Sequence, residues 1–188
     1  LTQDMTLAGC KVIFMYEYLH RVLGRLIGLL FMVPLLWFAL RGVVRPGLMP
    51  RLLVMLFLGG CQGLLGWYMV RSGLVARPSV SQYRLTAHLG LAVALFSAIV
   101  WQALSLWRGP ASEVSAGHGG RGKGVVALTL VLLVYLMILS GGLVAGMDAG
   151  RVYPTWPLMG ETFAPPGLYS TSPGWVAAFE DAITIQFN

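Results

Sequence analysis

Charged residues are what this sequence has least of. Only 11% of its 188 residues are charged, with 7 acidic against 13 basic side chains, whereas a soluble domain carries roughly 25% charged residues. This shortage argues against a soluble enzyme, a disordered tail and a nucleic-acid-binding module. The net charge of +6 does not change that conclusion, because the basic residues stand between long uncharged segments, a pattern typical of membrane proteins.

Cysteine is also scarce, since the chain holds only Cys10 and Cys61. Two cysteines cannot form a disulfide framework. Cys61 lies about ten residues inside its apolar segment, roughly 15 Å deeper than an interfacial Cys10, which is too far for a disulfide. The sequence also has no HExxH motif, so a catalytic zinc site, which needs three protein ligands, is disfavoured.

Apolar residues are abundant, at 57% of the chain with a mean hydropathy of +0.75. Four segments reach the roughly 20 apolar residues that a helix needs to cross a bilayer: about 11–40, 52–70, 85–107 and about 125–147. Their continuity predicts helices, because the strands of a membrane barrel would alternate in polarity. We therefore predict an all-α, polytopic membrane bundle with four transmembrane helices, surrounded by lipid and without a nucleic-acid partner.

The basic residues of the connecting loops predict an orientation. Six follow the first and third segments, against four on the opposite side. We expect 41–51 and 108–124 to be cytoplasmic, and 71–84 and 148–188 to lie outside. The Gly/Ser-rich stretch 109–124, which contains His118, predicts a flexible linker. The aromatic and proline-rich tail predicts an ordered outer loop at the membrane interface.

The first segment contains ionisable residues, which are costly in a bilayer and usually functional. Glu17 and His20 are three residues apart and share a helix face. Gly24 and Gly28 continue that face, where the absence of side chains admits a neighbouring helix or a flat ligand. Alternatively, Glu17 pairs with a basic neighbour such as Arg21, and the glycines form only a packing groove.

A second histidine, His88, lies about one turn from the outer end of the third segment. The predicted topology runs the first and third helices in the same sense, so His20 and His88 fall at similar depth in the outer leaflet. Two histidines at one level of a helical bundle are a usual way to hold a heme iron from both sides. The alternative is that each is a hydrogen-bonded packing residue.

Two further polar residues accompany this predicted site. Gln62 stands in the apolar second segment, where it bonds either across helices or to the polar edge of a ligand. Arg84 lies four residues before His88 on the same face. It serves either as a partner for a heme propionate or as a positive anchor at the membrane interface.

Four motifs in order resemble the heme A synthase family, in its proteobacterial and mitochondrial branch. They cover most of the chain apart from the inner loop: EYLHRVLGRLIGLL (17–30), QGLLGWYMVRSGL (62–74), SQYRLTAHLG (81–90) and SGGLVAGMDAGRVYPTWPLMGE (140–161). The family has eight membrane helices in two pseudo-symmetric halves. It oxidises the C8 methyl of heme O to a formyl group in successive steps, which yields heme A for cytochrome oxidase.

The resemblance also implies roles for single residues. His20 and His88 match the histidine pair of the first half, the axial ligands associated with the substrate heme, and Glu17 matches the glutamate of the family's ExxH motif. The second-half pair, associated with a heme b cofactor, has no counterpart in this sequence. The family's cysteine pair also lacks a match, because only Cys10 lies near that position.

The chain therefore resembles helices two to five of eight, an internal piece of a longer protein. We expect 1–108 to hold three first-half spans with the heme O/heme A site, 109–124 to be a cytoplasmic linker, and 125–188 to begin the second half. The expected location is the bacterial inner membrane, or alternatively the mitochondrial one. Expected partners are heme O, heme O synthase, an unidentified electron donor and further copies of the protein.

Two other functions fit parts of the pattern. A bis-histidine membrane cytochrome of b type, which only relays electrons, needs His20 and His88 but has no use for Glu17. A transporter or structural bundle needs none of the three in a heme site.

Overall fold

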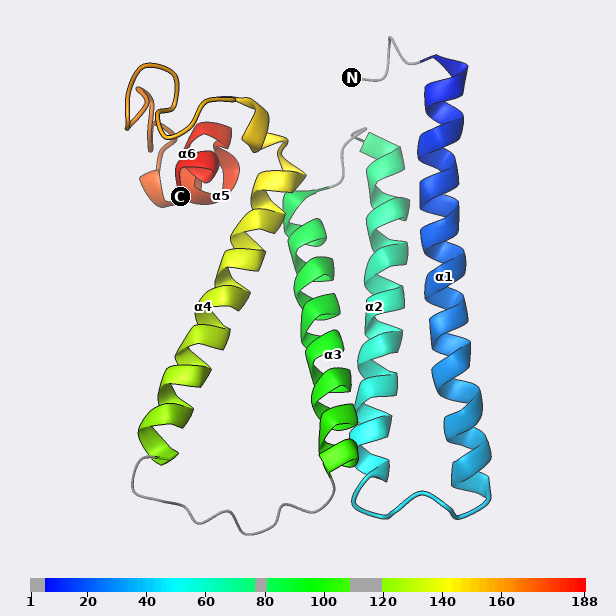
Figure 1. The fold of residues 1–188 in the computed structure, drawn as a ribbon. Coiled ribbons are helices and arrows are strands. Elements are labelled where there is room, and N and C mark those ends of the chain that lie inside the picture. The colour runs from blue at the N-terminus through cyan, green and yellow to red at the C-terminus, as the bar shows by residue number, and fades with distance from the viewer. Residues whose placement is uncertain (1–5, 77–80, 109–119) are drawn as a thin grey trace. The chain divides into compact units, whose positions relative to one another are not determined.

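A computed structural model describes residues 6–76, 81–108 and 120–188. Within these ranges the regular structure is helical (Figure 1). The four long helices are α1 (Leu7–Leu40), α2 (Met49–Ala76), α3 (Gln82–Arg108) and α4 (Gly120–Gly146). Each contains a stretch long and apolar enough to cross a membrane. The predicted all-α membrane fold with four spans is thereby confirmed, and the chain is a membrane protein.

The chain divides into two compact units, Leu1–Gly63 and Leu64–Asn188, with the boundary inside α2. In the first unit, α1 begins at Thr6, whose hydroxyl accepts a hydrogen bond of 3.2 Å from the amide of Gly9. It ends where Gly42 takes a positive φ of 66°. There the amide of Val43 donates to the carbonyl of Phe38, which closes a Schellman motif before α2.

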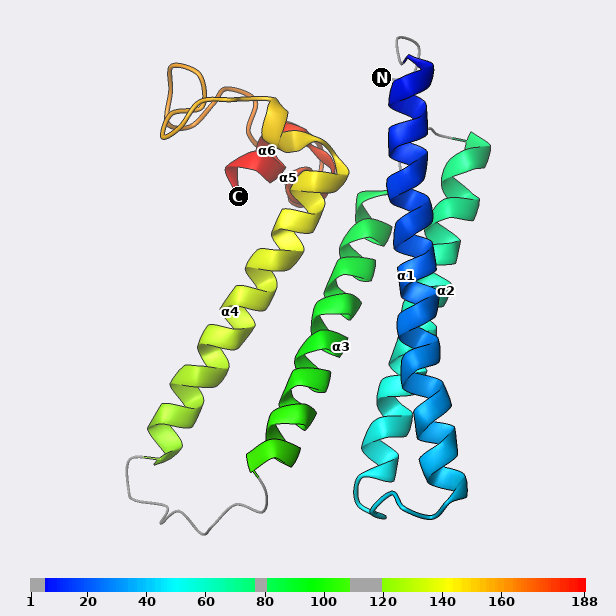
Figure 2. The same ribbon diagram turned by 45° about the vertical axis from the view of Figure 1, so that its right-hand side comes forward.

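In the second unit, α3 and α4 lie side by side and come closest at the start of α3 (Figures 1 and 2). Glycines of α4 make this approach possible. A Cβ added at Gly146 would lie 2.6 Å from the Cα of Gln82, and one added at Gly142 would lie 3.2 Å from the Cα of Thr86. The two backbones therefore touch without side chains between them.

The segment after α4 folds into a small ordered structure, as predicted, and its place outside the membrane remains a prediction. It contains a 3-10 turn, η1 (Ala149–Arg151), and two short helices, α5 (Gly174–Glu180) and α6 (Ala182–Phe187). Asp181 caps α6 by accepting hydrogen bonds from the amides of Ile183 and Thr184 at 2.8 and 3.3 Å. The fully buried Thr184 accepts a hydrogen bond of 3.1 Å from the amide of Tyr169. The sequence analysis did not predict these two helices.

Two predicted boundaries need correction. The helix of the second span continues to Ala76 instead of ending at Val70, and Arg71 lies over the ring of Trp67, 5.1 Å from its centroid. Helix α4 begins at Gly120, so 120–124 belong to it and not to the linker. Extending an existing helix costs less than nucleating one, which explains both extensions. The rest of that linker, 109–119 with His118, lies outside the described residues.

Candidate functional site

The predicted polar group on α1 is organised by the helix itself. Glu17 and Arg21, one turn apart, form an ion pair of 3.1 Å in which their side chains are 60% and 46% exposed. The pairing predicted as an alternative role for Glu17 is therefore present. His20 lies on the same face by its spacing and is exposed.

Below this group, α1 presents a strip without side chains. Gly24 and Gly28 are exposed, and within their own unit no described atom lies within 4 Å of a Cβ added at either position. Nothing described in that unit fills the strip as packing would. The strip is therefore a flat apolar surface beside Glu17 and His20, able to accept either a helix or a planar ligand.

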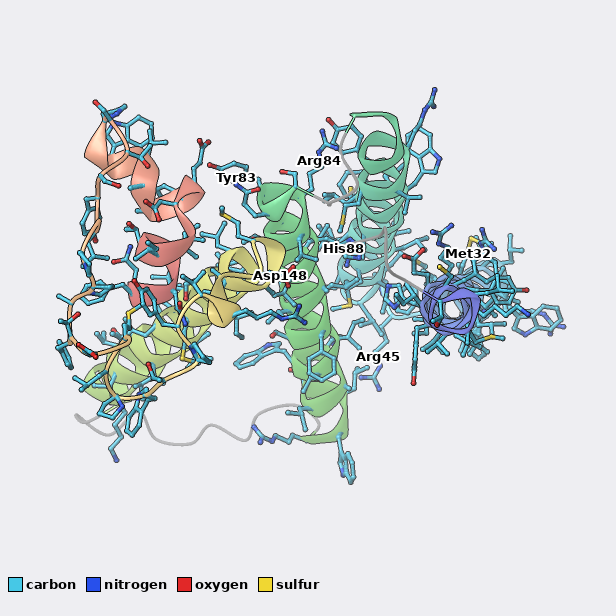
Figure 3. All side chains as sticks on the ribbon, turned by 90° about the horizontal axis from the view of Figure 1, so that it is seen from above. Met32, Arg45, Tyr83, Arg84, His88 and Asp148 are labelled. Carbon is cyan, nitrogen blue, oxygen red and sulfur yellow. The ribbon has the colours of Figure 1, made fainter. Side chains whose placement is uncertain are left out.

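His88, on α3, is held by packing between two helices. Figure 3 shows its side chain on the side of α3 that faces α2. A Cβ added at Gly66 of α2 would lie 3.2 Å from Cε1 of the imidazole and 3.9 Å from each ring nitrogen. The ring therefore points its Cε1 edge at the backbone of α2, in the space that a side chain at Gly66 would occupy.

Arg84 lies one turn before His88 and contacts the same helix. Its guanidinium carbon lies 4.3 Å from the centroid of the Tyr68 ring, and Nη2 donates a hydrogen bond of 3.3 Å to the Tyr68 hydroxyl. This cation–π contact and the contact at Gly66 fix the register of the last part of α2 against α3. A positive charge is thus held one helical turn above the imidazole.

The remaining predicted residue, Gln62, is half-buried in α2, one turn before Gly66 along the same helix. It belongs to the first unit, together with Glu17 and His20, whereas Arg84 and His88 belong to the second. The predicted pairing of His20 with His88 links the two units and remains a prediction, as does the role of Gln62.

The other side of α3 has a different character. A largely apolar groove of about 580 Å³ lies there, lined by α3, α4 and α5 and including Thr86, Gly90 and Leu139. At its rim the Tyr83 hydroxyl donates to the Glu180 carboxylate at 3.0 Å, and the Gln82 amide donates to the Phe179 carbonyl at 3.4 Å. The groove is therefore separate from the position of His88.

Sequence reasoning missed two features of this region. The role of Gly66 could not be predicted, because nothing in its own helix shows which residue it faces. The contact of Tyr83 with Glu180 joins residues 97 positions apart, and no local pattern signals it. By contrast, the cap at Asp181 had a readable signal, since aspartate is a preferred N-cap residue.

Comparison with known sequences gives the family. The sequence profile of the COX15-CtaA family, described as cytochrome oxidase assembly protein, matches residues 1–188. The chain belongs to this family.

Several curated members of the cytochrome oxidase assembly family are similar over the whole chain. The heme A synthase of Parvibaculum lavamentivorans is 44% identical over 188 residues, which are 100% of this chain and 53% of the relative. The heme A synthase of Nitrosospira multiformis is 48% identical over 184 residues, 98% of this chain and 51% of the relative. The chain thus spans about half the length of these relatives. No solved structure matches it.

Proposed function

We propose that this chain is part of a heme A synthase, which oxidises the C8 methyl group of heme O to a formyl group and so makes heme A. The observation that carries the proposal is the imidazole of His88, set in a membrane span against a glycine of the preceding helix, α2. The names of the relatives, together with the ExxH spacing of Glu17 and His20, support the same reaction.

The residues present suit a bound heme. His88 is half-buried in a membrane span, and we assign it and His20 as the two axial ligands of the substrate iron. The side-chain-free strip at Gly24 and Gly28 suits a planar macrocycle, because a ring can lie directly on the backbone there. Gln62 is proposed to bond to a polar edge of the same ligand.

Arg84 is proposed to bind a heme propionate. Its guanidinium stands one turn from His88 at the start of a span, where a carboxylate at the rim of a ring coordinated below would meet it. Arginine suits this role because its planar group binds a carboxylate through two parallel hydrogen bonds. Binding a propionate in this way requires Arg84 to share or exchange its present contact with Tyr68.

Glu17 is proposed as the catalytic residue. Oxidising an unactivated methyl group requires oxidising power that heme iron and oxygen supply and that no side chain has. The carboxylate of Glu17, one turn from His20, can stabilise positive charge that develops on the methyl carbon, or accept its proton. Arg21 holds that carboxylate through the ion pair of 3.1 Å and so orients it.

The finer assignments of cofactor, partners and organisation are also proposals. A resident heme b is expected to be bound by the second half of the protein, whose histidines this chain does not contain. Residues 1–108 are proposed as the first half and 125–188 as the beginning of the second. Heme O synthase is proposed as the supplier of substrate, with an electron donor and self-association as further interactions.

The proposal is tested by replacing Glu17 with glutamine, which keeps the size of the side chain and removes its charge. The variant should bind heme with a near-normal absorption spectrum. It should form heme A at about one hundredth of the normal rate or below, as expected when an acid–base group is lost. Heme content and the ratio of heme A to heme O are measured on the same membranes. The control is Glu161→Gln, in the outer loop.

The outcome also distinguishes heme A synthesis from electron relay by a bis-histidine cytochrome. His20→Ala and His88→Ala should each weaken heme binding or change the spin state of the iron in either case. If well-folded Glu17→Gln protein makes heme A at the normal rate, Glu17 has no part in the mechanism and the electron-relay function is favoured. If the substitution only lowers the amount of folded protein, Glu17 is a structural partner of Arg21.

We further propose that the chain lies in the bacterial inner membrane with 41–51 and 108–124 in the cytoplasm and 71–84 and 148–188 outside. With Cys10 and Cys61 replaced by serine, cysteines are introduced at the exposed positions Gly47 and Thr171. A membrane-impermeant thiol reagent added to spheroplasts should label Thr171→Cys and spare Gly47→Cys until the membrane is opened. The reverse labelling would contradict the orientation.

A further inference from the structure

One glycine of α2 is matched to a functional side chain of α3. A Cβ at Gly66 would lie 3.2 Å from Cε1 of His88, which is tighter than nine in ten real Cβ contacts, so the imidazole would have to shift by a few tenths of an ångström. Both ring nitrogens lie 3.9 Å from the same point. The glycine thus faces the edge of the ring between its two nitrogens.

This arrangement determines where the nitrogens point. Cε1 lies between Nδ1 and Nε2 in the imidazole ring. Because Cε1 faces the α2 backbone, the two nitrogens point away from Gly66 in two diverging directions. A side chain at this position would push the ring away or rotate it about its χ angles, and either motion would re-aim both nitrogens. The contact between Arg84 and Tyr68, one turn away, keeps α2 and α3 in the register that brings Gly66 opposite His88.

Glycines of α3 and of the second half of α4 have different surroundings. Gly142 and Gly146 give space to the backbone of α3, and Gly90 gives space to the side chains of Leu139 and Tyr135. At Gly141, an added Cβ would meet nothing within 4 Å in the described part of the chain. By contrast, the empty space at Gly66 is taken by an imidazole.

We propose that Gly66 is a positioning residue, which sets the orientation of the His88 imidazole for binding heme iron. The inference rests on the proposed function, because it requires His88 to be an iron ligand. It adds a residue that touches neither the iron nor the methyl group that reacts. Its effect passes through the ring of His88, as is usual for residues that hold a metal ligand in place.

The test compares Gly66→Ala and Gly66→Val with Gly141→Ala and Gly141→Val in the purified, heme-loaded protein. The readouts are the electron paramagnetic resonance spectrum of the ferric heme, its midpoint potential and the amount of folded protein. Gly66→Ala should shift the low-spin signal while heme stays bound. Gly66→Val should convert much of that signal to high spin and weaken heme binding by about tenfold or more. The Gly141 variants should match the parent.

A second background tests whether the effect passes through His88. In His88→Gly protein, added imidazole should restore the low-spin signal, since a free ligand can take the vacated place. Adding Gly66→Ala to that rescued protein should change the signal little, because a free imidazole can adjust its position. Such non-additivity is the signature of two residues that act through one contact.

Other outcomes overturn the inference in distinguishable ways. A parental spectrum and potential in Gly66→Val would show that the glycine does not orient the ring, and so would a loss of folded protein with an unchanged spectrum per bound heme. An equal effect of Gly66→Ala in the rescued protein would show that it acts elsewhere. If His88→Gly itself keeps the parental spectrum, His88 is no ligand, and the ligand assignment in the proposed function fails together with the positioning role.

Discussion

The polar residues of α1 and those of α3 are held in place by different means. On α1, the partner of Glu17 within the described part of the chain is Arg21, one turn away in the same helix and also exposed. On α3, His88 lies against Gly66 and Arg84 lies over Tyr68, so both depend on α2. One group is organised by helix geometry alone, and the other by the packing of two helices.

This difference makes the Glu17–Arg21 pair easy to rearrange and the His88 ring hard to move. An exposed ion pair within one helix is weak, and its side chains can change partner at little cost. A ring that fills the space above a glycine can move only if a helix moves or the ring rotates. In the proposed mechanism this division is appropriate, because Glu17 has to handle charge or a proton during the reaction, whereas His88 has to stay directed at one atom.

The largest expected effect comes from breaking the support of α3 on its α4 side. Gly146→Ala would place a Cβ 2.6 Å from the Cα of Gln82, and a backbone cannot yield as the end of a side chain can. We expect a destabilisation of about 2–3 kcal/mol, seen as a fall of roughly 5–10 °C in the apparent melting temperature in detergent.

The matched control for that experiment is Gly141→Ala, five residues earlier on α4 and exposed. It should leave the melting temperature unchanged or raise it slightly, because alanine favours a helix more than glycine does. Equal melting temperatures for the two variants would mean that α4 does not hold α3 through a close backbone contact. The heme spectrum of Gly146→Ala should also change, since a displaced α3 carries His88 with it.

An intermediate effect is expected where the outer loop meets α3. Tyr83→Phe removes the hydrogen bond of 3.0 Å to Glu180 and keeps the ring, so α5 should be held less tightly by about 1 kcal/mol. Limited proteolysis by chymotrypsin should then cut near Trp175 and Phe179 about fivefold faster. Tyr16→Phe, at an exposed position on α1, serves as the control. Equal cleavage rates would contradict an anchoring role for Tyr83.

The fold was largely predictable from the sequence because the bilayer imposes a simple rule. Long uncharged stretches must be helical, and all four predicted spans are present. The short helices α5 and α6 escaped prediction, since segments of 7 and 6 residues are too short to show a helical period and are held by tertiary contacts such as that of Thr184.

In the candidate site, too, features set by spacing within one helix could be predicted, and features set by packing between helices could not. The shared face of Glu17, His20 and Arg21 follows from spacings of three and four residues, so it could be predicted from the sequence. The partner of His88 could not, because it depends on the register of α2 against α3, which the contacts at Gly66 and Tyr68 decide only once the chain is folded. Residue types point to the proposed chemistry, and packing points to the residue proposed to position the imidazole.

The smallest expected effect is that of Arg21 on α1, which is measured against Arg84 on α3. Arg84→Gln removes a stacked cation and its hydrogen bond to Tyr68, a contact between two helices, and should lower the stability of the folded protein by about 1 kcal/mol. Arg21→Gln removes an exposed ion pair within one helix and should lower it by about 0.5 kcal/mol or less. Raising the salt concentration should shrink the Arg21 effect further, since exposed pairs are screened, and should change the Arg84 effect little. Both values come from melting curves of each variant at low and high salt. If Arg21→Gln proves the more damaging of the two, the ion pair on α1 is a structural element, and the contrast between the two helices does not hold.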